Sequence, residues 1–227
     1  MSTITYSGVS SDTLGIMVNQ IIVPPSSVEE YEMIKIPGRP EPLRSNLKTR
    51  PPIQIEVEAT IVEDNVLRQI YSTFQGTGKL IRSTEPDKYY NASAQVITPE
   101  NIARYMHKIT LGFECMPFAY AVSNDPVELE ISGSAATIDV GGGYYCQPIY
   151  KIYGSGDITL SVNGASLLTL YNVDGYVTVD TALMMCHKNG LHVKSSGKLP
   201  FLSPGTNMLS WSSNVTAVEV IKNERWL

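Results

Sequence analysis

Alternation of apolar and polar positions is the dominant pattern in the first half of the chain. From Ile53 to Ile61 every second residue is apolar, with polar residues between. This period of two predicts a half-buried β-strand, because successive side chains of a strand point to opposite faces. Residues 105–115 show the same alternation and predict a second long strand. We expect Pro117 to end it, because proline cannot donate a hydrogen bond to a β-ladder.

One segment between these two strands changes to helical spacing. Apolar side chains recur at intervals of three and four residues between Val66 and Phe74, and Gly76 follows. This spacing places them on one stripe of an α-helix, and a glycine is typical just beyond a helix end. The pattern predicts a single amphipathic helix that packs on a sheet.

The second half of the chain has shorter alternating segments with frequent turn signals. Asn163-Gly164 and Asn189-Gly190 predict tight hairpin turns, and we expect further turns at residues 141–143, 154–157 and 174–175. Short strands at this spacing favour a β-sandwich. With the boundary placed at residues 119–126, we expect an N-terminal domain over residues 1–120 and a C-terminal domain over residues 121–227.

The segment from Pro37 to Pro52 contrasts with the rest of the first half. It is rich in proline, carries four basic residues and has few apolar ones. A long stretch without evident secondary structure in a compact domain is often an interaction arm, although a mobile surface loop is the alternative. The candidate contact residues of this arm are Gly38, Arg39, Pro40, Arg44, Lys48 and Arg50.

Charge and composition exclude several classes of function. The formal net charge is −5 with a pI of about 5.2, whereas a protein that grips phosphates needs a basic surface, so no specific nucleic-acid binding is expected. No apolar run approaches the 18 residues that a membrane-spanning helix needs. The three cysteines are far apart and predict free thiols in a reducing compartment.

The sequence nominates no catalytic, metal-binding or cofactor-binding residue. There is no Gly-x-Ser-x-Gly elbow and no His-Glu-x-x-His motif, and the three histidines are scattered. Tyrosine is abundant, with 13 residues. The neighbours Tyr144 and Tyr145 are candidates for stacking on sugars, although tyrosine is equally common on strands and at protein interfaces.

Several short segments of the sequence resemble, in the same order along the chain, the distal tail protein (Dit) family of siphophages. Siphophages have long non-contractile tails. The segments lie across nearly the whole chain, and their collinear order is more specific than any single segment. One departure is Pro40-Glu41, where members of the family commonly have an acidic residue followed by glycine. The matching segments are Leu14-Gly15-Ile16, Ile34 to Arg39, Phe113 to Phe118, Gly154 to Ile158, Val173-Asp174-Gly175, Leu199 to Asn207 and Arg225-Trp226-Leu227.

The resemblance implies a mainly β protein. Its N-terminal β-sandwich has one α-helix and an extended arm, and its C-terminal β-sandwich is galectin-like. It further implies a non-enzymatic baseplate protein that forms a hexameric ring at the tail tip of the virion. This homo-hexamer would join the tail-tube protein to the tail-associated hub or lysin protein, with a receptor-binding protein as a further partner. The protein would be made in the host cytoplasm and act in host adsorption. A carbohydrate-binding adhesion module is the alternative function.

Overall fold

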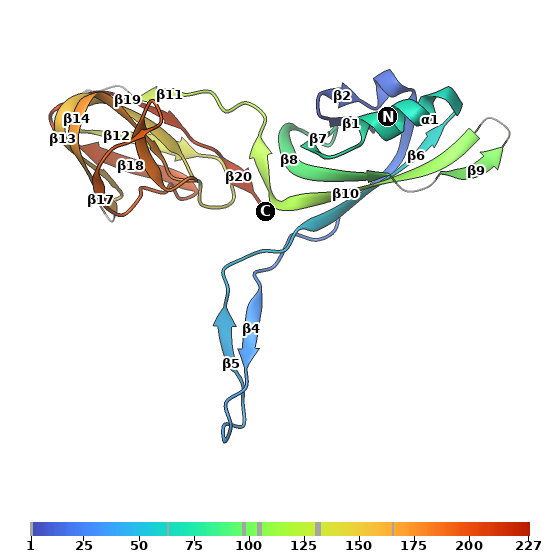
Figure 1. The fold of residues 1–227 in the computed structure, drawn as a ribbon, viewed down its shortest axis with the longest axis horizontal. Helices are drawn as coiled ribbons and strands as arrows, with labels where there is room; N and C mark the ends of the chain where they lie inside the picture. The colour runs from blue at the N-terminus through green and yellow to red at the C-terminus, as the bar shows by residue number, and fades with distance from the viewer. Residues whose placement is uncertain (1, 63, 97–98, 104–105, 130–132, 165) are drawn as a thin grey trace. The chain divides into compact units, whose positions relative to one another are not determined.

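The computed structural model describes residues 2–62, 64–96, 99–103, 106–129, 133–164 and 166–227. The chain folds as two compact units, residues 1–122 and residues 123–226, with Leu227 grouped with the first. Both units are built of antiparallel strands, and one α-helix occurs among the described residues (Figure 1). The prediction of a mainly β fold with β-sandwich architecture is confirmed. No helix in the described ranges is long and apolar enough to cross a membrane.

The described residues of the first unit form the α-helix, a short 3-10 helix and ten strands. In chain order these are β1 (Ile4–Tyr6), β2 (Val9–Ser10), η1 (Asp12–Leu14), β3 (Ile16–Ile22), β4 (Tyr31–Ile34), β5 (Leu43–Asn46), β6 (Ile53–Ile61), α1 (Asp64–Thr73), β7 (Thr77–Arg82), β8 (Glu85–Val96), β9 (Glu100–Ala103) and β10 (Met106–Ala121).

The main sheet of this unit runs in the order β2-β1-β7-β8-β10-β6-β3, and β9 pairs with β10. The alternation in β6 is confirmed, because its five apolar side chains are buried and its polar residues face outward. On the inner side Tyr6, Phe74 and Phe113 form an aromatic cluster with ring centroids 5.4 to 5.9 Å apart. Ile70 of α1 is also fully buried. The predicted helix is therefore confirmed as the element that covers one face of the sheet.

The predicted end of the second long strand is wrong. Strand β10 continues through Pro117 to Ala121, and its register with β8 shifts between Cys115 and Ala119. A bulge is one of the few places where a strand tolerates proline, because the ladder is interrupted there. Tyr105, which the alternation pattern included, lies outside the described residues.

The second unit is built of the remaining ten strands. They are β11 (Val127–Leu129), β12 (Ala135–Val140), β13 (Ile149–Val162), β14 (Ser166–Asp180), β15 (Met185–Lys188), β16 (Leu191–His192), β17 (Ser195–Gly197), β18 (Gly205–Trp211), β19 (Val215–Ile221) and β20 (Arg225–Trp226).

Two long strands organise this second unit by changing partners along their length. Strand β13 pairs with β19 through residues 149–154 and with β18 through residues 160–162. Strand β14 pairs with β15 near one end and with β17 near the other. Strands that switch between sheets at bulges make the corners of a sandwich. The apolar side chains enclosed in this way include Tyr150, Ile152, Leu160 and Val177, all fully buried.

The turn predictions in this unit had mixed outcomes. Asn163-Gly164 joins β13 to β14 and Asn189-Gly190 joins β15 to β16, and all four residues have positive φ, so these two are confirmed. Residues 154–157 and 174–175 lie inside β13 and β14 and pair with each other, with a register shift after Gly156. The expected turns at these two places are wrong. Residues 141–143 form a connection rather than a hairpin, because β12 pairs with β18 and not with β13.

Candidate functional site

Strands β4 and β5 form a hairpin that pairs with no other described strand (Figure 1). Its apolar side chains are exposed to solvent: the exposed fraction is 48% for Tyr31, 54% for Met33, 41% for Ile34 and 43% for Leu43. An isolated two-stranded hairpin is marginally stable in water, and contiguous exposed apolar groups mark interaction sites. The hairpin, residues 31–46, is therefore the leading candidate for an interaction element.

The register gives the hairpin two different faces. Tyr31 pairs with Asn46 and Met33 with Arg44, so these four side chains share one face. The guanidinium carbon of Arg44 lies 3.9 Å from the centroid of the Tyr31 ring, a cation–π contact that holds the charge over this face. The opposite face carries Ile34 and Leu43 with Glu32 and Ser45.

The base of the hairpin is closed by a set of polar contacts. Glu30 and Thr49 are joined by a backbone hydrogen bond of 2.8 Å and by one of 2.9 Å from the Thr49 hydroxyl to the Glu30 carboxylate. The Arg50 guanidinium donates to the carbonyl of Ser27 and lies 3.4 Å from the carboxylate of Glu29. These contacts hold together the two chain segments that lead from the main sheet into the hairpin, although the hairpin has no hydrophobic core of its own.

The tip of the hairpin contains a β-turn at Pro37-Gly38. The Arg39 amide donates to the Ile36 carbonyl at 3.1 Å, and Gly38 has a φ of 83°. Proline at the second position and glycine with positive φ at the third are the signature of a type II turn. The sequence Ile36-Pro37-Gly38-Arg39 is therefore the local reason why the chain reverses here.

The six predicted arm residues fall at three levels of this hairpin. Gly38, Arg39 and Pro40 lie in the connection between β4 and β5, Arg44 lies on β5, and Lys48 and Arg50 lie toward the base. The expectation that residues 37–52 lack secondary structure is wrong, because β5 occupies residues 43–46. The first strand of the hairpin, β4, was missed by the alternation of apolar and polar positions, since all four of its residues are exposed. The role of the six arm residues in contacts with a neighbour stays a prediction.

The candidate glycan contacts, Tyr144 and Tyr145, lie side by side with ring centroids 4.6 Å apart. Tyr145 also meets Phe201 edge-on at 5.9 Å, and the guanidinium carbon of Arg225 lies 4.4 Å from its ring centroid. Arg225 is buried and donates to the Tyr145 carbonyl at 2.6 Å. The ring of Tyr145 is thus engaged within its own unit, and sugar binding at this pair stays a prediction.

The histidines and cysteines are not gathered in one place. His107 is buried on β10, whereas His187 and His192 are cross-strand partners on β15 and β16. Within the described ranges no three His, Cys, Asp or Glu side chains are placed to hold a metal ion. All three thiols are buried, and burial raises the pKa of Cys115 to about 12. Because the thiolate is the reactive form, Cys115 is poorly suited to act as a nucleophile at neutral pH.

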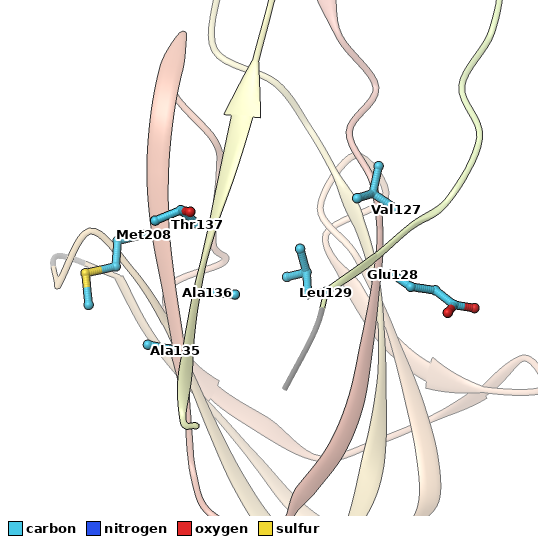
Figure 2. A pocket seen from close by; sticks show the side chains of 7 residues that line it. All are labelled: Val127, Glu128, Leu129, Ala135, Ala136, Thr137 and Met208. Carbon is cyan, nitrogen blue, oxygen red and sulfur yellow. The ribbon is translucent and has the colours of Figure 1, made fainter. Parts of the chain in front are cut away.

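A cavity of about 530 Å³ opens between two edge strands of the second unit. Figure 2 shows Val127, Glu128 and Leu129 on one strand facing the strand that carries Ala136 and Thr137, with Glu128 directed away from the space between them. The lining is mainly apolar and contains no cluster of polar groups of the kind that orients a small ligand. This opening separates two edge strands, β11 and β12, and has no arrangement of side chains suited to catalysis or to binding a small ligand.

These features define a two-unit antiparallel β protein with an exposed interaction hairpin. Residues 12–115, which include the hairpin, match the family model of the phage tail protein RIFT-related domain. No curated protein matches the chain. The fold is similar to the crystal structure of SPP1 Dit (gp 19.1), described as a paradigm of the hub adsorption apparatus in phages that infect Gram-positive bacteria. The TM-score is 0.78 at 15% sequence identity, with 100% of both chains covered. The resemblance to the distal tail proteins of siphophages therefore holds at the level of the fold, and residues 12–115 match a phage tail domain.

Proposed function

We propose that the chain is a structural hub protein of a siphophage tail tip, with no enzymatic activity. In this proposal six copies form a ring that joins the tail-tube protein to the tail-associated hub or lysin protein, and a receptor-binding protein attaches as a further partner. The chain is made in the host cytoplasm and works in the virion during host adsorption. The match of residues 12–115 to a phage tail domain and the likeness to SPP1 Dit over both full chains support this role.

The single observation that carries the proposal is the exposed apolar hairpin β4–β5. A cyclic ring needs heterologous contacts, in which one patch of a subunit meets a different patch of the next. A hairpin whose apolar side chains are 41% to 54% exposed suits such a contact, since a neighbouring copy would bury them. We assign ring formation to the first unit, with residues 31–46 as the clasp. The second unit, as a galectin-like β-sandwich, is the proposed platform for the host-recognition proteins.

The experiment is light scattering after size exclusion, with negative-stain images of the main peak. Six copies of 24.9 kDa give a particle of about 150 kDa with a central hole. Replacing residues 31–46 by a short Gly-Ser linker leaves the Glu30–Thr49 contacts in place, and we expect this variant to be a folded monomer. A matched control replaces Leu183, Met184 and Leu191, exposed apolar residues of the second unit, by serine and should keep the ring. The proposal is contradicted if the unaltered chain stays monomeric. It is also contradicted if the variant without the hairpin still forms the ring.

A further inference from the structure

The outer face of the main sheet in the first unit has a hollow of about 350 Å³. It is formed by β7, β8 and β10 with Pro52, which precedes β6, and no residue of the hairpin lines it. Met116 lies at this hollow with 55% of its surface exposed, although its neighbour Cys115, on the inner side, is buried. A methionine is well suited to fit an irregular apolar partner, because its side chain is unbranched and flexible.

An unpaired carboxylate stands beside Met116 in the same hollow. Glu114 is exposed, and its cross-strand neighbours are Gln54 on β6 and Ser93 on β8, neither of which is basic. Lys79 also lines the hollow, but its ammonium group lies 4.2 Å from the centroid of the Tyr89 ring. Among the described residues Glu114 makes no ion pair, so its charge is open to a partner.

One face of the hairpin has the complementary chemistry. Met33 is 54% exposed, and Arg44 stands next to it across the two strands, held over the Tyr31 ring. Arg44 makes no ion pair with a described residue. Tyrosine, methionine and arginine are the side chains enriched in the contact areas of protein interfaces.

Charge favours a second copy of this chain as the partner of that face. The hairpin, residues 31–46, carries three basic side chains and two acidic ones, a net charge of +1. The whole chain carries −5, which leaves −6 on the remainder. Opposite potentials steer two surfaces together and fix their register, so the hairpin of one copy is attracted to the acidic body of another.

We propose that the hairpin of one copy docks on the outer sheet face of the next, with Met33 in the hollow against Met116 and Arg44 facing Glu114. This inference rests on the proposed function, because it names the surface that the clasp grips. The contact joins two different patches, so repeating it around an axis can build a ring, whereas a two-fold dimer would need one patch to meet itself.

Cysteine cross-linking tests the proposed contact directly. The double variant Met33→Cys, Met116→Cys places thiols only on exposed positions, and the three native thiols are buried. With oxidised glutathione as the oxidant we expect a ladder of disulfide-linked species up to the hexamer on non-reducing gels. The single variants are the control and should give no ladder beyond the dimer. Absence of the ladder in the double variant overturns the inference.

A charge exchange tests the second contact without removing a core residue. We expect Arg44→Glu and Glu114→Arg each to weaken self-association on the order of tenfold or more, because like charges then face each other across the interface. The double variant should recover most of this loss, whereas Glu128→Arg in the second unit should have no effect. Single variants that assemble normally, or a double variant as weak as its parents, overturn the inference. If loss of the hairpin abolishes the ring while these results fail, the clasp stands and only its docking surface is wrong.

Discussion

Asn163, in the turn between β13 and β14, donates a hydrogen bond of 3.0 Å from its side-chain amide to the side-chain oxygen of Asn207 on β18. Asn207 is fully buried, and its amide also donates to the carbonyls of Ser203 and Gly205 while accepting from the Ser203 amide. Asn163 in turn bonds the backbone of Met208 in both directions, at 2.8 Å each. The pair therefore ties the β13–β14 turn to the segment that precedes β18.

Asn207→Ala should destabilise the second unit by about 2–3 kcal/mol. The change leaves buried backbone donors and acceptors without partners, and each such group costs about 1–3 kcal/mol. Urea unfolding monitored by the fluorescence of Trp211, which lies in the same unit, measures the effect. Thr137→Ala, on an exposed position of β12, is the control and should change the unfolding free energy by less than about 0.5 kcal/mol. Equal stability of the two variants would show that the Asn207 network is dispensable.

Arg50→Ala should loosen the base of the hairpin without unfolding the first unit. The guanidinium bonds the Ser27 carbonyl and faces Glu29, and hydrogen bonds to charged groups contribute about 1.5–3 kcal/mol. We expect cleavage within the hairpin by a protease of low specificity to rise about tenfold in the monomeric protein. Arg39→Ala removes an exposed arginine at the tip and should leave the cleavage rate unchanged. Equal cleavage rates in Arg50→Ala and Arg39→Ala would show that the contacts at the base do not stabilise the hairpin.

Cys115 should make the first unit less stable in alkaline solution. Burial raises the pKa of this thiol from 9.0 to about 12, so the folded chain keeps the proton that the unfolded chain loses first. The unfolding free energy is therefore unaffected below pH 9 and falls between pH 9 and pH 12, by up to about 1.4 kcal/mol per pH unit. Denaturant unfolding at pH 8 and pH 10, compared between the chain and Cys115→Ala, isolates this contribution. The two proteins should differ in their pH dependence, and parallel curves would refute the assignment.

Gly154→Ala should be costly although the change is small. A Cβ at this position would lie 2.6 Å from the Asn214 carbonyl oxygen and 3.2 Å from the Val215 Cα, both backbone atoms. Because the backbone of a packed sheet cannot move away freely, we expect a loss of about 1–3 kcal/mol in unfolding free energy. Gly112→Ala is the matched control, because its Cβ meets nothing closer than 3.8 Å. Thermal unfolding of the two variants should separate them clearly, and similar melting temperatures would contradict the close approach.

Loss of the Tyr144–Tyr145 pair should leave retention on cell-wall polysaccharide unchanged, because the proposed role of the chain is structural. Tyr145 is 43% exposed, and its ring contacts Arg225 and Phe201 within its own unit. In a pull-down with purified cell walls we expect the chain and the double variant Tyr144→Ala, Tyr145→Ala to be retained equally. Retention that depends on these tyrosines would favour the adhesion module instead, provided that circular dichroism shows the variant to be folded.

The sequence predicted the elements that bury one face and expose the other. It missed the elements whose two faces are equally exposed. Strand β6 and helix α1 each bury one side, so their periodicity could be read directly. Strand β4 has four exposed residues in succession, and no pattern distinguishes it from a loop. Gly154 and Gly175 looked like turn residues, but they pair with each other inside two long strands, where space is short at Gly154 and Gly175 has a φ of 78°. Glycine marks close approach as readily as reversal, and only the tertiary neighbour decides between them.

Likewise, Pro117 could not be interpreted from local rules alone. Its compatibility with β10 depends on the register shift with β8, a strand that lies more than 20 residues earlier in the chain. The candidate site shows the same limit, because the contacts of Arg50 with Ser27 and of Glu30 with Thr49 join residues about 20 positions apart. The proline-rich composition located one half of the hairpin, whereas its partner strand became visible only through pairing.

The positive charge of the hairpin also disfavours one kind of contact, the pairing of two hairpins from different copies. A two-stranded ribbon with open edges invites pairing with another ribbon of the same kind, and natural proteins discourage this with charged side chains, lysine above all. Lys35, Arg39 and Arg44 outnumber Glu32 and Glu41 in residues 31–46, so each hairpin has a net charge of +1 and two hairpins repel before their edges meet. Pairs formed hairpin to hairpin would be closed dimers that remove subunits from any larger assembly. The charge that attracts the hairpin to the acidic body of another copy thus also keeps unassembled chains from being trapped in such dead ends.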